Sequence, residues 1–176
     1  TAWGESGIAI VRLSGGGSRD LVNSIFRGGE GLSLSPPRFM KHGFILDNEG
    51  DPVDEVLAVW FRRPGSYTGE EAAEIHCHGG TVAARKCLEL CLAGGARMAR
   101  PGEFTRRAFM NGRIDLAEAE SVLGVIRSRS DQALRAAVKC LRGHFSARVK
   151  SVNDDMADLS ADRKSTRLNS SHRIRT

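Results

Sequence analysis

The strongest constraint on this chain is a stripe of apolar residues in its C-terminal third. Its members are spaced three or four residues apart: Leu134, Val138, Leu141, Phe145, Val149, Val152, Met156 and Leu159. Such spacing is nearly a heptad repeat and lines one face of an α-helix. We therefore predict one long helix over these residues. Its apolar face must pack on other helices, either of a truncated helical domain or of a partner chain.

The residues before this stripe show the patterns of an α+β domain. The segment GIAIVRLSG (7–15) is a β-branched run closed by glycines, typical of a buried strand. Two apolar runs flank the turn sequence DNEGDP (47–52), which predicts a β-hairpin. A hairpin argues against a purely parallel, doubly wound sheet. We expect a mixed β-sheet with flanking helices over residues 1–112, followed by the start of a helical domain over 113–162.

Local signals predict the ends of several helices. Ser18 is the expected N-cap of a helix over SRDLVNSIF, and Gly94 is expected to close a helix over TVAARKCLELCLA. The segment ARMARPGEFTRRAFMNG predicts a strand and then a short helix that Gly112 caps. From Asp115, the sequence DLAE has the form of a capping box.

Charge and composition narrow the function classes only slightly. The formal net charge is +5, but residues 163–176 contain five basic residues and no acidic one, so the rest of the chain is balanced at 21 and 21. This tail lacks apolar periodicity and looks like translated adapter sequence, so we expect it to be non-native. No apolar run approaches the ~20 residues of a membrane helix. The four cysteines form no C-x-x-C pair, and reduced thiols in a cytoplasmic protein are expected.

The segment EIHCHGG (74–80) is the densest group of chemically active side chains. On a strand, His76 and His78 share one face and Cys77 faces the other, so a metal site would need His42 or Glu74 as a further ligand, without supporting spacing. A nucleophilic role for Cys77 has little support for the same geometric reason. The turn HGGT could bind an anion at a helix N-terminus or could simply allow a tight turn. We expect no metal site and no catalytic residue in this chain.

Four segments together resemble the N-terminal part of one protein family. They are GIAIVRLSG, PGSYTGEEAAEIHCHGG, ARPGEFTRRAFMNGRIDLAEAE and LRGHFSARV. The resemblance is to the tRNA uridine-5-carboxymethylaminomethyl modification GTPases, the MnmE (TrmE) family, and it covers about residues 1–162. The chain opens TAWGESG without a Met. We expect the family's first few residues, and all that follows the first helices of its helical domain, to lie outside this chain.

The resemblance implies a fold and a function. It implies a tetrahydrofolate-binding-like fold that binds 5-formyl-tetrahydrofolate and mediates homodimerisation. In the full protein, a G domain would hydrolyse GTP with potassium and magnesium. An FAD-dependent partner protein would act with it on the wobble uridine of tRNA. The GTP-binding motifs are absent from this sequence, so the chain alone is not expected to be catalytic.

Three folate contacts follow from the resemblance: Arg12 in IVRLSG, Glu74 in AAEIHCHGG and Arg113 in NGRIDL. The last position is often Lys in the family, and Arg would keep the charge while changing the donor geometry. A pterin edge presents adjacent N–H donors, which suits the two oxygens of a carboxylate such as Glu74. Two other functions stay open: a folate-dependent one-carbon transferase, and an interaction module without a ligand.

Overall fold

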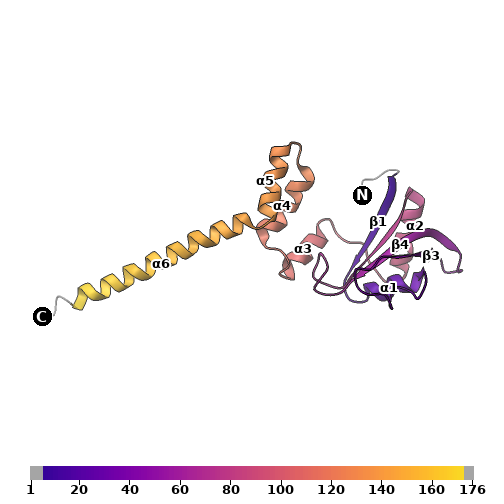
Figure 1. Ribbon diagram of the computed structural model, residues 1–176, viewed down its shortest axis with the longest axis horizontal. Coiled ribbons are helices and arrows are strands. Elements are labelled where there is room, and N and C mark those ends of the chain that lie inside the picture. The colour runs from indigo at the N-terminus through magenta and orange to yellow at the C-terminus, as the bar shows by residue number, and fades with distance from the viewer. Residues whose placement is uncertain (1–5, 173–176) are drawn as a thin grey trace. The chain divides into compact units, whose positions relative to one another are not determined.

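The computed structural model describes residues 6–172, and the side chains of residues 6–161. The chain divides into two compact units, Thr1–Arg113 and Ile114–Thr176. The first unit is an α+β fold, as predicted (Figure 1). Its elements are β1 (Ser6–Ser14), α1 (Ser18–Ile25), β2 (Phe26–Arg27), β3 (Lys41–Leu46), β4 (Pro52–Phe61), β5 (Ala72–Gly79), α2 (Thr81–Ala93) and α3 (Glu103–Met110).

The five strands form one sheet in the order β1-β5-β4-β3-β2. All four pairings are antiparallel, where the sequence suggested strands of both senses. The predicted hairpin is confirmed as β3 and β4. Strand β5 is the last in the sequence but lies between β1 and β4 in the sheet. Residues more than 60 positions apart in the sequence, such as Arg12 and Glu74, therefore become neighbours.

One face of the sheet carries the core of this unit. Alternate residues of β5 (Ala73, Ile75 and Cys77) are buried there, beside Ala9 and Leu13 of β1. Helices α1 and α2 lie against this face and add side chains such as Val22, Cys87 and Cys91 to the same cluster (Figure 1). Alternation along the strands therefore assigns the intervening residues to the opposite face.

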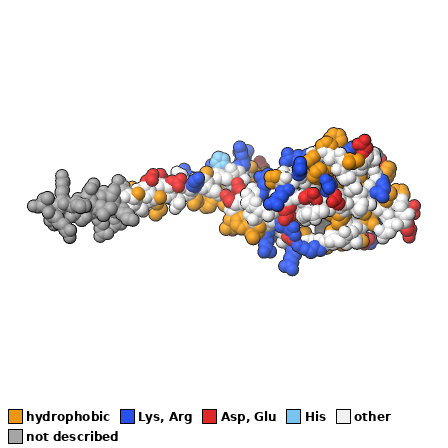
Figure 2. Space-filling view, turned by 90° about the horizontal axis from the view of Figure 1, so that it is seen from below, with side chains coloured by type: hydrophobic (Ala, Val, Ile, Leu, Met, Phe, Trp, Pro, Cys, Tyr) orange, Lys and Arg blue, Asp and Glu red, His pale blue; other side chains and the backbone are white. Residues whose placement is uncertain are grey.

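The opposite face is mixed apolar and titratable. One row crosses four strands as Ile10, His76, Leu57 and His42, because Ile10 pairs with His76, His76 with Leu57, and Leu57 with His42. Ile10 and Leu57 are 39% and 40% exposed, so this row is only partly covered. Over the side of the molecule drawn in Figure 2, Lys and Arg side chains are interspersed with Asp and Glu.

Two local predictions in the first unit are wrong. Gly17, with φ 85°, is the N-cap of α1, and the Ser18 hydroxyl instead donates to the Gly15 carbonyl oxygen at 2.6 Å. The carboxylate of Glu71, from the loop before β5, accepts from the N–H groups of Gly17 and Arg19 and does the capping. The strand predicted before α3 does not form: residues 96–100 have an irregular backbone and pair with no described strand.

The second unit consists of α4 (Leu116–Arg127), α5 (Asp131–Leu141) and α6 (His144–His172). The capping box is confirmed: Asp115 accepts from the Glu118 N–H, and the Glu118 side chain accepts from the Asp115 N–H, both at 2.8 Å. The prediction of one long helix over 134–159 is wrong. The helix breaks at Gly143, whose φ of 77° lies in the left-handed region that ends helices.

No described helix is both long and apolar enough to cross a membrane. The backbone of α6 continues into the tail that we expected to be non-native, but the side chains after residue 161 lie outside the described part.

Candidate ligand-binding site

The antiparallel pairing of β1 with β5 sets Arg12 directly opposite Glu74. Side chains opposite each other in such a ladder lie on the same face of the sheet and within reach. Arg12 Nε donates to Glu74 Oε1 at 2.7 Å. The register of the sheet therefore joins two of the three residues predicted to contact a ligand.

Glu74 is held by a second residue of its own strand. His76, two positions further along β5, places Nε2 3.1 Å from Glu74 Oε2. The Glu74 side chain is 15% exposed and that of Arg12 is 45% exposed. Each carboxylate oxygen thus has a polar partner, and the guanidinium retains donors that face outward.

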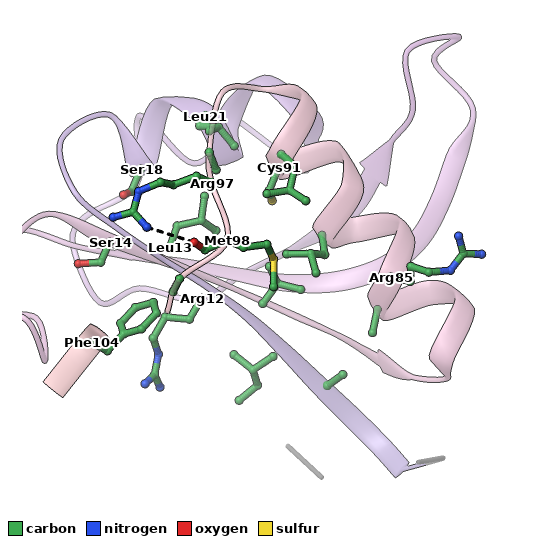
Figure 3. A pocket seen from close by; sticks show the side chains of 18 of the residues that line it. Arg12, Leu13, Ser14, Ser18, Leu21, Arg85, Cys91, Arg97, Met98 and Phe104 are labelled. Atoms are coloured by element: carbon green, nitrogen blue, oxygen red, sulfur yellow. Dashed lines mark hydrogen bonds between the residues drawn. The ribbon is translucent and has the colours of Figure 1, made fainter. Parts of the chain in front are cut away.

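An aromatic ring lies beside Arg12. The guanidinium carbon is 5.9 Å from the ring centroid of Phe104, which belongs to α3 (Figure 3). This distance is within the range of a cation–π contact. The Arg12 side chain is therefore positioned by both a carboxylate and an aromatic face.

Arg113, the third predicted residue, lies in the turn after α3. Its N–H donates to the Ala108 carbonyl oxygen at 2.8 Å. Among the described residues, no hydrogen bond or ion pair links Arg113 to Arg12 or Glu74. It is nevertheless tied to the same end of the sheet, because Asn111 donates to the Thr68 carbonyl oxygen and Ser14 of β1 contacts the Thr68 hydroxyl.

A network of carboxylates and arginines anchors α3 to this end of the sheet. Arg107 bonds both Glu70 and Glu103, each at 3.0 Å. Burial alone would raise the pKa of Glu70, but hydrogen bonds from Ser14 and Arg107 outweigh it and lower the pKa. The hydrogen bond from Arg97 is the largest cause of the strongly lowered pKa of Glu103. These carboxylates are therefore ionised partners that position α3 and its Phe104.

A cavity of about 780 Å³ adjoins Arg12 on the core side of β1. Its walls come from β1, α1, α2, α3 and the segment 95–99 (Figure 3). Apolar side chains such as Leu13 and Met98 line most of it, with Arg12, Ser14 and Arg97 among its polar groups. Of the three residues predicted to contact a ligand, Arg12 lines this cavity, whereas Glu74 and Arg113 are not among its lining residues.

The burial of EIHCHGG alternates as predicted, with Cys77 buried between a partly exposed His76 and an exposed His78. His76 bonds Glu74, whereas His78 bonds Asp54 with Nδ1 2.7 Å from Oδ1. Cys77 points into the core, where its thiol donates to the Ala9 carbonyl oxygen at 3.4 Å. The two histidines thus serve separate carboxylates, and His78 has a raised pKa, mainly because it is hydrogen-bonded to Asp54.

Comparison with known proteins decides the family. A family model described as the N-terminus of the GTP-binding protein TrmE matches residues 1–113. The chain belongs to the TrmE family. It is 47% identical over 161 residues to the tRNA modification GTPase MnmE of Moorella thermoacetica, and 44% over 163 residues to that of Symbiobacterium thermophilum. It is also 46% identical over 164 residues to that of Syntrophomonas wolfei.

These matches concern only part of each relative. They cover 90–92% of this chain but 35–36% of the relatives, so the chain spans about a third of their length. The predicted resemblance to the TrmE family is therefore confirmed, and this chain corresponds to one region of a longer kind of protein.

Two members of the site were not predicted from the sequence. His76 lies two residues from Glu74 on a strand, and that spacing could have identified it as a partner on the same face. Phe104 lies 92 positions from Arg12 in the sequence, and no sequence pattern joins them. Only the packing of α3 against the end of the sheet brings this ring to the guanidinium.

Proposed function

We propose that this TrmE-family chain is the folate-binding, dimerising N-terminal module of a tRNA modification GTPase. The observation that carries the proposal is the Arg12–Glu74 pair, a guanidinium and a carboxylate held 2.7 Å apart, whose Arg12 member lies beside an aromatic ring and also lines a cavity. The ligand is 5-formyl-tetrahydrofolate, with Arg113 as the third contact, from this subunit or across a dimer.

The chemistry of reduced folate suits these groups. Its pterin edge carries adjacent N–H donors that a carboxylate accepts in a bidentate pair, the role assigned to Glu74. Arg12 binds one oxygen of Glu74, and the remaining lone pairs of the carboxylate would meet the ligand. The carboxylates of folate would meet the free donors of Arg12 or Arg113.

The remaining functions belong to the longer protein. We assign GTP, potassium and magnesium to a G domain outside this chain. We also assign to the full-length protein a cytoplasmic location, an FAD-dependent partner protein, and tRNA with its wobble uridine as substrate. The names of the relatives, tRNA modification GTPase MnmE, support this assignment. By this proposal the module itself binds and assembles but catalyses no step.

Calorimetric titration with 5-formyl-tetrahydrofolate tests the ligand assignment. Glu74→Gln keeps the size of the side chain but turns one acceptor into a donor, so we expect affinity to fall about tenfold or more. Arg113→Ala should also weaken binding. Arg106→Ala, on the exposed side of α3, is the matched control and should bind as the parent does. Equal affinity of the parent and Glu74→Gln would refute the pterin assignment.

The same titration separates the alternatives. Absence of heat and of any thermal shift with the parent chain would favour an interaction module without a ligand. Binding followed by transfer of the one-carbon unit from the bound folate to an acceptor would favour a one-carbon transferase.

A further inference from the structure

Two thiols and a carboxylate from three separate elements meet behind the sheet. Cys77 of β5, Cys87 of α2 and Asp54 of β4 place their ligating atoms within 4.8 Å of one another. Cys77 and Cys87 are 2% and 0% exposed, and the Asp54 side chain is 10% exposed. Two thiolates and one carboxylate form a donor set that borderline-soft divalent metals such as zinc prefer.

The Asp54 carboxylate is oriented by its neighbours and keeps a free position. Oδ2 accepts from the His78 N–H at 2.8 Å, and Oδ1 contacts the His78 ring Nδ1 at 2.7 Å. Oδ1 also accepts from the Glu55 N–H at 3.0 Å. Because a carboxylate offers about four lone-pair positions, these three bonds leave one for a further partner. Metal-ligating groups are commonly held by such outer hydrogen bonds.

The two thiols lie side by side with little to compensate a second negative charge. Both thiols are buried, and burial disfavours the charged thiolate form of each. A bound dication would compensate this charge, since two thiolates, one carboxylate and a dication leave a single negative charge facing His78.

We propose that Cys77, Cys87 and Asp54 form a binding site for a divalent transition metal of the zinc type. Zinc–sulfur bonds of about 2.3 Å put two tetrahedral sulfur ligands about 3.8 Å apart, so movements of about 1 Å close the site. Binding breaks no carbon bond and changes no oxidation state. Each of the two thiols loses its proton to solvent, and Cys77 gives up its bond to the Ala9 carbonyl oxygen.

Such a site would act structurally. It would tie β4 and β5 to α2 immediately before the turn at Gly79 and Gly80, on the sheet face opposite Glu74. The proposal is independent of folate binding, because none of the three ligands belongs to the candidate ligand-binding site.

Cobalt titration of the whole chain tests the proposal. The chain is kept reduced with a phosphine and free of oxygen, and Co²⁺ is added. We expect one equivalent to produce sulfur-to-cobalt charge-transfer absorption in the near ultraviolet and tetrahedral bands in the visible. Zn²⁺ should displace both and raise the melting temperature. Affinity should rise with pH, because binding releases thiol protons.

Variants identify the ligands. Cys87→Ser should abolish the charge-transfer absorption, or weaken Co²⁺ binding at least tenfold. His78→Ala removes only the outer hydrogen bond and should weaken binding about tenfold. Its side chain is 67% exposed, so the fold should tolerate this change. Cys91→Ser, a buried thiol one turn further along α2, and Cys140→Ser in the second unit are controls that should bind as the parent does.

Two results would overturn the proposal. One is a folded, reduced parent chain that shows no sulfur-to-cobalt absorption at millimolar Co²⁺. The other is absorption that survives in Cys87→Ser or that Cys91→Ser removes equally. Circular dichroism of each variant without metal separates loss of ligands from loss of fold.

Discussion

At the scale of single residues, ion pairs position the side chains of the candidate site. Arg12 would be an ordinary exposed arginine without Glu74, and Arg107 bridges two carboxylates that would otherwise repel each other. The pKa values of Glu70 and Glu103, the two carboxylates bound by Arg107, are lowered, so their ionisation couples the fold to pH.

Glu103 gives the clearest pH dependence. Its folded pKa is strongly lowered from the ordinary 4.5, first by Arg97. Its stabilisation is therefore fully present above pH 4.5 and is lost as the pH falls towards the folded pKa. We expect Glu103→Gln to lower the melting temperature clearly at pH 7 and by a smaller amount at pH 3, where part of the stabilisation is already lost. Glu89→Gln, in an exposed pair with Arg85, should have little effect at either pH. A Glu103→Gln deficit that is equal at both pH values would contradict this prediction.

At the scale of elements, one glycine allows two strands to approach each other and another ends a helix. Gly43 of β3 lies against β2 so closely that a Cβ would be 2.3 Å from the Arg27 carbonyl oxygen and 2.6 Å from the Phe26 ring. Gly143 separates α5 from α6 with a φ of 77°. In the first case the constraint is space, and in the second it is backbone conformation.

Gly43→Ala tests the close approach. Backbone atoms of β2 must move to admit the methyl group, so we expect the free energy of unfolding to fall by about 1–3 kcal/mol or more in urea titrations. Gly16→Ala adds a methyl group where nothing lies within 4 Å and should change stability far less. Equal stabilities of the two variants would show that β2 yields easily.

Gly143→Ala tests the break between the last two helices. A residue with a Cβ costs about 1–2 kcal/mol in the left-handed region, so this variant should lower the stability of the helical unit by about that amount. Gly143→Asn should cost less, because Asn tolerates this conformation. Thermal unfolding followed by circular dichroism measures both. A gain in helicity and stability for Gly143→Ala would mean that α5 and α6 prefer to be continuous.

At the scale of the whole molecule, partly exposed apolar surface marks where the chain would meet other protein. In the first unit, Ile8, Ile10, Phe44 and Leu57 are 39–60% exposed on one sheet face. In the second unit, the predicted apolar stripe is also exposed, with Val149 at 51% and Leu159 at 70%. Apolar surface of this extent is characteristic of interaction sites.

The proposed homodimer yields a test of the sheet face. If this face forms the interface, Leu57→Glu buries a charge there and should weaken dimerisation at least tenfold, or about 1.4 kcal/mol. Leu34→Glu makes the same change at a loop residue that is 73% exposed and should leave the dimer intact. Sedimentation equilibrium measures both. A Leu57→Glu chain that dimerises as the parent does would place the interface elsewhere.

The sequence by itself determined the class of fold, most elements and the family. Alternation and helical spacing depend only on which side chains avoid water, so β1, the β3–β4 hairpin, α2 and the Asp115 capping box could be predicted locally. The choice of Arg12 and Glu74 came from family resemblance, and that they lie opposite each other depends on the register of β1 against β5.

Tertiary structure alone decided the contacts between distant segments. The capping of α1 by Glu71, the ring of Phe104 beside Arg12, and the meeting of Cys77, Cys87 and Asp54 each join residues from different elements. Sequence patterns record the environment of a side chain but not which distant residue provides it. Those partners are fixed only when strands pair and helices pack. The free energy of burial is non-directional, so it does not specify a partner, and each buried donor bonds to an acceptor that the packing has placed within reach.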